Sequence, residues 1–261
     1  MLTLLSADAR PAGSYAFSPP DNQDLFEKNL REQPQDWVWR SCSVTYTLNS
    51  QGFRCGEFED LDWSNSVLVF GCSNTFGIGV DDSDTWPAKL SRVIMKSVIN
   101  LAQGGQGWGF NWVNSLRVIE AGYRPLAVVY YWPTVERMFT LPNSNNPNQV
   151  MGHGHWNTTR DTARPEIQLG LLWAQDPVLS AFWADHYRRS LDIMWGLKGV
   201  PVFHYTWDSR STVPGVEHLP VFSSVKNNNQ LWARDLKHPG PTDHAITALR
   251  VSVRLNLNRD L

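Results

Sequence analysis

The sequence lacks several features that mark whole classes of protein. No apolar run is long enough to span a bilayer, and the first ten residues hold no basic leader and only a short apolar stretch. The 23 Lys and Arg residues nearly balance the 25 Asp and Glu residues, so the formal net charge is only -2. A nucleic-acid binder or a polybasic membrane partner would show a basic excess. We therefore expect a soluble protein with neither kind of partner.

Cysteine and metal-ligand patterns are also sparse. The three cysteines, Cys42, Cys55 and Cys72, cannot all pair within the chain. The spacing of Cys42 and Cys55 allows one disulfide but is not diagnostic, so we expect cytosolic thiols. The pair His153 and His155 has no Cys or clustered carboxylate beside it, so we predict no metal site. The glycines at 104–109 lack the spacing and the Lys-Ser/Thr ending of phosphate-binding loops. We expect no cofactor.

Tryptophan, by contrast, is abundant, with 13 residues in a chain of 261. We expect most of them to fill a core, including those in segments with a helical pattern. Exposed Trp side chains would instead indicate carbohydrate stacking or a protein interface. The sequence does not separate the two groups.

Apolar runs alternate with amphipathic segments along most of the chain. Strands are predicted at 66–71, 97–101, 126–132, 200–205 and 218–222, and helices at 85–94, 108–121, 169–197 and 242–255. The third run is continuously apolar, which is typical of a central strand buried on both faces. This order predicts an α/β fold, a three-layer α/β/α sandwich with a central parallel sheet of about five strands.

Two segments do not fit the alternating pattern. Residues 1–36 are polar and broken by prolines. We predict an extension over 1–60 that packs on a main domain at 61–261, with one short helix near 24–31 and a strand at 44–48. Residues 140–165 are rich in Asn, Pro, Gly and His without periodicity. We expect a long loop insertion there, acting as a lid or an interface.

A serine stands directly after the first predicted strand. Ser73 lies in the small-residue turn that follows the apolar run 67–70, where open α/β folds place their active sites. Near the other end of the chain, Asp235 and His238 are spaced as Asp-x-x-His. A serine, a histidine and an aspartate can act together as nucleophile, base and orienting carboxylate. The alternative is that Ser73 only caps its turn and that His238 and Asp235 are surface groups.

Four ordered segments resemble the SGNH (GDSL-like) hydrolase superfamily. They are Asn49 to Glu57 (Asn-x-x-Gly-Phe-Arg-x-x-Glu), Gly71 to Gly77 (Gly-x-Ser-x-Thr-x-Gly), Asn100 to Gly105 (Asn-Leu-x-x-Gly-Gly) and Asp235 to Pro239 (Asp-x-x-His-Pro). The resemblance implies a flavodoxin-like fold with Ser73 as nucleophile, His238 as base and Asp235 as the orienting acid. It also implies an oxyanion hole formed by the backbone N–H groups of Ser73 and Gly105.

Two positions depart from the family pattern. Cys72 stands where the family has an Asp in the segment Gly71 to Gly77. That Asp is not the family's catalytic acid, so its loss is tolerable. The cysteine is also an alternative nucleophile. After the third strand the family has an Asn that donates to the oxyanion, and this chain has no Asn there. Thr134 is the candidate substitute, or the hole has only two donors.

We therefore expect a serine esterase that forms an acyl-enzyme, with O-acetyl groups on saccharides as the substrate class that the resemblance suggests. An O-acyltransferase acting on saccharides is a second hypothesis. A third is a structural or interaction protein on the same fold, for example in a virus particle, with a homo-oligomer or larger assembly. We expect the protein to be cytoplasmic or virion-associated. The residues that bind substrate, and the acyl and alcohol groups, are not evident from the sequence.

Overall fold

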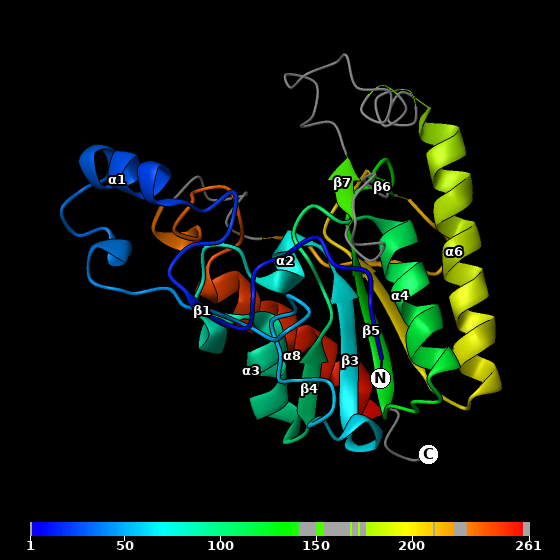
Figure 1. Ribbon diagram of the computed structural model, residues 1–261. Coiled ribbons are helices and arrows are strands. Elements are labelled where there is room, and N and C mark those ends of the chain that lie inside the picture. Colours follow the sequence, from blue (N-terminus) through cyan, green and yellow to red (C-terminus); the bar gives the residue numbers. More distant parts are fainter. Residues whose placement is uncertain are drawn as a thin grey trace.

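Five parallel strands form the central sheet in the computed structural model, which describes residues 2–140, 150–153, 168, 172, 176–210, 212–221 and 229–257 (Figure 1). The strands are β3 (Ser66–Gly71), β4 (Ser97–Asn100), β5 (Ala127–Trp132), β8 (Val202–Thr206) and β9 (Glu217–His218). Their order across the sheet is β4-β3-β5-β8-β9, and every pairing is parallel. The predicted parallel sheet of about five strands is confirmed. The bounds of β4, β5 and β8 lie within two residues of those predicted, and β9 begins one residue early and has just two residues.

Helices cover both faces of this sheet. The helices α3 (Trp86–Ile94) and α8 (Pro241–Leu257) lie together on one face, and α4 (Trp108–Glu120) and α6 (Pro177–Leu197) lie on the other (Figure 1). Each face has its own apolar cluster. The three-layer sandwich predicted from the sequence is therefore the observed architecture.

The core follows from strands that are apolar on both faces. In β3 all six residues are buried, with Val67 and Val69 packed toward α3 and α8, and Leu68 and Phe70 toward α4 and α6. Tryptophan fills much of the remaining space, as predicted. The buried Trp residues include Trp37, Trp39, Trp63, Trp86, Trp108, Trp132 and Trp195. Trp112 and Trp183 are half-buried, and Trp173 lies outside the described residues.

The helix starts agree with the local sequence. Thr85 caps α3 by accepting a hydrogen bond from the backbone N–H of Ala88. Asp176 caps α6 in the same way, with Pro177 in the first turn. The predicted helix at 169–197 is confirmed from Pro177 onward, and most of its first piece lies outside the described residues. Short 3-10 turns occur at Val38–Arg40, Trp63–Asn65, Asp82–Asp84 and Asn229–Leu231.

The amino-terminal segment is more ordered than its composition suggests. It contains β1 (Gly13–Tyr15), α1 (Gln23–Glu32) and β2 (Tyr46–Leu48), and β1 pairs antiparallel with β2. The strand β1 was not predicted. Leu2 and Leu4 are buried in the cluster under α4 and α6, so the segment is not polar throughout. The domain boundary at residue 60 stays a prediction.

The loop insertion at 140–165 stays a prediction, although short strands occur at its beginning and within it. Strand β6 (Met138–Thr140) pairs antiparallel with β7 (Met151–His153), so one strand borders this stretch and another lies within it. Such three-residue strands leave no periodic signal, because pairing with a distant segment stabilises them. Residues 141–149 and 154–165 lie outside the described residues. Within the part of the chain described, we find no helix of the length and hydropathy needed to cross a membrane.

Candidate active site

Ser73 is the first residue of the short helix α2 (Ser73–Phe76). Cys72, the N-cap position of this helix, connects it directly to the end of β3. Strand β3 lies between β4 and β5 in the sheet. The chain reaches β4 through α3 on one face of the sheet, and it reaches β5 through α4 on the other face. Such a switch point leaves a crevice at the carboxyl ends of the strands. The turn requires Gly71, because a Cβ there would lie 2.2 Å from Thr75 Oγ1.

Asp235 and His238 form a close pair in the segment before α8. His238 Nδ1 lies 2.6 Å from Asp235 Oδ2, and the backbone N–H groups of Lys237 and His238 each donate to Asp235 Oδ1 at 3.1 Å. The carboxylate is buried, which by itself raises its pKa. The hydrogen bonds from His238 and the two amides outweigh burial and hold the pKa of Asp235 below its usual value. The imidazole is thus oriented, and Nε2 is the ring nitrogen left to accept a proton.

Ser73 and His238 line the same cavity, which has a volume of about 480 Å³. Its wall consists of Ser73, Asn74, Arg137, Trp207, Asp208, Ser209, His218, Pro220, Val221, Trp232, Lys237, His238 and Pro239. Asp235 lies behind His238 rather than on the wall. Cys72 is 0% exposed and does not line the cavity, so its thiol is poorly placed as an alternative nucleophile.

The two other predicted oxyanion positions do not line this cavity. Gly105 lies in the turn between β4 and α4, with a positive φ of 76° that favours glycine. Thr134 follows β5 and is fully buried, and its hydroxyl has no hydrogen-bond partner among the described residues. Asn100 links this region to the nucleophile turn, since its side chain donates to the carbonyl oxygen of Thr75 at 3.1 Å.

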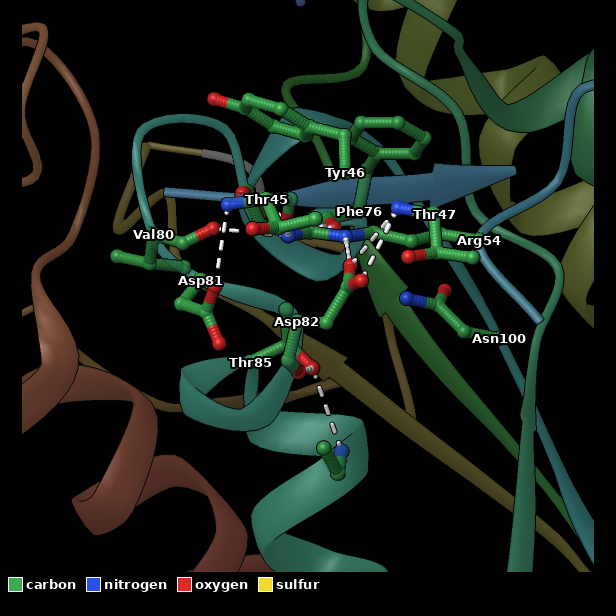
Figure 2. A network of polar contacts seen from close by, with 12 residues as sticks. Thr45, Tyr46, Thr47, Arg54, Phe76, Val80, Asp81, Asp82, Thr85 and Asn100 are labelled. Atoms are coloured by element: carbon green, nitrogen blue, oxygen red, sulfur yellow. Dashed lines mark hydrogen bonds and ion pairs between the residues drawn. The ribbon is translucent and has the colours of Figure 1, made fainter. Parts of the chain in front are cut away.

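The motif at 49–57 contributes a buried arginine that holds the turn after Ser73 (Figure 2). The Arg54 side chain is only 2% exposed and forms an ion pair with Asp82. Its guanidinium donates to the carbonyl oxygens of Phe76, Gly77 and Val80 at 3.0, 2.7 and 2.8 Å. A planar group with five donors suits such a set of acceptors. The motif therefore supports the end of α2 rather than the cavity wall.

A second buried arginine lies next to Asp235. Arg234 forms an ion pair with Asp21, from the amino-terminal segment. Tyr46 donates its hydroxyl proton to the same carboxylate at 2.6 Å and accepts from the backbone N–H of Gly79 at 2.7 Å. The amino-terminal segment, the turn after Ser73 and the segment carrying Asp235 thus share one buried network.

Sequence reasoning missed most of the cavity wall. Arg137, Trp207, Asp208, His218 and Trp232 were not singled out, although all five line the cavity. The sequence did hold a signal for Trp207 and Asp208. They directly follow β8, and the carboxyl ends of parallel strands meet at one edge of the sheet. Arg137 contacts Trp207, with its guanidinium carbon 5.8 Å from the ring centre.

The remaining histidines have other surroundings. Within the described ranges we find no cluster of three His, Cys, Asp or Glu side chains suited to a metal ion. His153 lies in β7, and His155 is outside those ranges. His244 lies in the first turn of α8, as predicted, and its Nδ1 accepts from the backbone N–H of Trp86 at 2.9 Å. Burial and the nearby charge of Arg54 lower the pKa of His244 to about 3.

Comparison with known proteins gives similarity at the level of the fold. No protein-family model and no curated protein sequence matches the chain. A family two carbohydrate esterase from Cellvibrio japonicus is 10% identical with a TM-score of 0.42, and the match covers 74% of this chain and 61% of that one. A Clostridium thermocellum esterase of the same family, solved with cellohexaose, is 13% identical with a TM-score of 0.41, over 75% of this chain and 65% of that one.

A third solved structure is matched over nearly its whole length. This protein of the G-D-S-L family from Desulfitobacterium hafniense DCB-2 is 13% identical with a TM-score of 0.34, and the match covers 74% of this chain and 99% of that one. The chain spans less than two thirds of the length of the two carbohydrate esterases. The solved structures that match this chain thus include two carbohydrate esterases and a protein of the G-D-S-L family.

Proposed function

We propose that the protein is a serine esterase that works through an acyl-enzyme. Ser73 Oγ attacks the ester carbonyl carbon while His238 Nε2 takes the hydroxyl proton. The bond from the carbonyl carbon to the alcohol oxygen breaks, and His238 returns the proton to that oxygen. Water then attacks the acyl-enzyme by the same route and releases the acid and free Ser73. Asp235 holds the imidazole in the tautomer that this sequence requires.

One observation carries the proposal: the Asp235–His238 pair, at 2.6 Å, stands at a cavity that Ser73 also lines. The alternative nucleophile Cys72 is enclosed, which favours the serine. The backbone N–H groups of Ser73 and Gly105 remain our candidates for stabilising the oxyanion. Each such donor is worth about 10²–10³ in rate.

Saccharides are the substrate class that we favour. Trp207 and Trp232 are half-buried in the cavity wall, and aromatic faces of this kind suit the apolar faces of sugar rings. An O-acetyl group on such a ring would bring a small acyl group to Ser73. A saccharide hydroxyl in place of water would make the same site an acyltransferase. Release of acetate, measured with and without excess saccharide acceptor, distinguishes the two reactions.

Labelling with a fluorophosphonate followed by mass mapping tests the proposal. We expect the wild type to be labelled at Ser73 and Ser73→Ala to remain unlabelled. Ser209→Ala is the matched control, because Ser209 lines the same cavity and has no proposed role; it should label like the wild type. Failure of the folded wild type to react, or unchanged labelling of Ser73→Ala, would overturn the proposal and favour a structural protein on this fold.

A further inference from the structure

The outer side of α6 carries a row of side chains that is unusually apolar for a solvent-facing surface. Its members, here called the α6 row, are Val178, Phe182, His186, Arg189, Ile193 and Leu197. The spacings of three and four residues place them along one side of the helix. The four apolar members, in chain order, are 79%, 63%, 63% and 81% exposed. Apolar side chains that gather on one exposed surface mark an interaction site.

The position of α6 leaves this row accessible. The opposite side of the helix packs on α4 and the sheet, with Leu191 and Trp195 fully buried (Figure 1). The helix has 21 residues, about 31 Å, so the row extends over most of one edge of the molecule. A contact surface of this length is sufficient for a helix-to-helix interface between two proteins.

The α6 row is symmetric about its own midpoint, which lies between residues 187 and 188, half a residue from the middle of the helix. Val178 and Leu197 lie at equal distances from it, as do Phe182 and Ile193, and the two polar members in the centre are also equidistant. An antiparallel copy of the helix, related by a two-fold axis at this midpoint, would place each residue opposite its counterpart in the pair.

We propose that the α6 row is the contact surface of a symmetric dimer, in which α6 packs antiparallel against α6 of a second copy. A two-fold interface needs a surface that is complementary to itself. The row meets this requirement, because its two apolar ends face each other in the antiparallel arrangement: Phe182 packs on Ile193 of the second copy, and Val178 on Leu197. The proposal does not depend on ester hydrolysis.

The charges at the centre of the row favour a second copy over a lipid surface. Arg189 Nε lies 2.7 Å from Asp185 Oδ2, and the arginine side chain is 65% exposed. At a two-fold axis, the Asp185–Arg189 pairs of the two copies lie side by side, with the Asp185 of each copy near the Arg189 of the other. A lipid surface offers no such matched set of positive and negative groups, so a second copy is the occupant that these charges favour.

Mass measurement by light scattering after size-exclusion chromatography tests the dimer. We expect the wild type to have twice the mass of one chain at micromolar concentrations, and Phe182→Asp with Ile193→Asp to halve it. Leu249→Asp is the matched control, because Leu249 is 55% exposed on α8, away from the row; this variant should stay dimeric. A monomeric wild type, or a double variant that is folded by circular dichroism and still dimeric, would overturn the proposal.

Cysteine crosslinking tests the antiparallel direction. In a Cys42→Ser background, which removes the exposed native thiol, Phe182→Cys combined with Ile193→Cys should give a covalent dimer on oxidation. Phe182→Cys alone should remain monomeric on a non-reducing gel, because its two copies lie far apart along the helix pair. Crosslinking of the single variant, or none of the double variant, would contradict the proposed interface.

Discussion

The Asp21 carboxylate and the Arg234 guanidinium form a buried ion pair at 2.6 Å, although 213 residues separate them in the chain. The arginine precedes the proposed catalytic acid Asp235, and the backbone N–H of Arg234 donates to the carbonyl oxygen of Gly79 at 3.0 Å. Asn29 donates to the Arg234 carbonyl oxygen at the same distance. The amino-terminal segment therefore holds the backbone that carries Asp235.

Breaking this pair should weaken both the fold and the reaction. Asp21→Ala leaves a buried arginine charge unpaired, which typically costs about 3–5 kcal/mol. We expect the free energy of unfolding in urea to fall by that amount, and ester turnover to fall with it. Asp24→Ala, an exposed position on α1, should change stability by less than about 0.5 kcal/mol.

Replacing both partners distinguishes loss of the pair from loss of packing. Asp21→Leu with Arg234→Met removes both buried charges and fills a similar volume, so it should recover at least part of the lost stability. A double variant as unstable as Asp21→Ala would show that the stability comes from packing or from the Tyr46 contact, not from the ion pair.

Arg54→Lys should destabilise the turn that follows Ser73. A lysine ammonium has three donors at one point and cannot span the carbonyl oxygens of Phe76, Gly77 and Val80 together with Asp82. We expect a loss of about 3 kcal/mol in the free energy of unfolding, because several buried acceptors lose their donor. Arg31→Lys on the surface of α1 is the control and should be neutral. Equal stability of the two variants would refute the supporting role of Arg54.

Thr134→Val should leave the protein as stable as the wild type or stabilise it by about 1 kcal/mol. The Thr134 hydroxyl is buried and has no hydrogen-bond partner among the described residues, so removing it relieves a desolvation cost. Thermal and urea unfolding measure this change. A loss above about 1 kcal/mol would mean that the hydroxyl is satisfied in the folded protein.

The same variant also examines the oxyanion hole. A fall in kcat of about 10² or more in Thr134→Val, with activity kept in Thr134→Ser, would assign the third donor to this hydroxyl. An unchanged kcat would leave the hole with two backbone donors.

Acidification should destabilise the protein through His244. Its pKa is about 3 in the folded state against the usual 6.5, so between these values the unfolded chain binds a proton that the folded chain does not. The free energy of unfolding therefore falls as the pH drops from 6.5, by about 2 kcal/mol at pH 5 for this group alone. Urea unfolding of the wild type at pH 7 and pH 5 measures the loss.

His244→Gln isolates that contribution. The glutamine carbonyl can still accept from the backbone N–H of Trp86 but does not titrate in this range. The variant should lose about 2 kcal/mol less than the wild type between the two pH values. Identical losses in both proteins would show that other groups account for the acid sensitivity.

The sequence predicted the strands best where both faces of the strand are buried. The strands β3 and β5 were predicted to within a residue, because continuous apolar runs of this length are stable only when both faces are covered. The three-residue strands β1, β6 and β7 were missed. Their residues carry no alternation, and pairing stabilises them rather than local propensity: β1 pairs with β2, and β6 with β7.

The sequence by itself determined the turn that carries Ser73 and the Asp235–His238 pair. Both are local: Ser73 follows its strand directly, and a spacing of three residues lets the Asp235 carboxylate orient the ring of His238. Only the tertiary structure decided which other groups meet them, including Arg137 and Trp207 on the cavity wall and Asp21 behind it. The reason is that parallel strands bring the ends of distant segments to one edge of the sheet, and which side chains then touch depends on packing between segments that carry no shared local pattern.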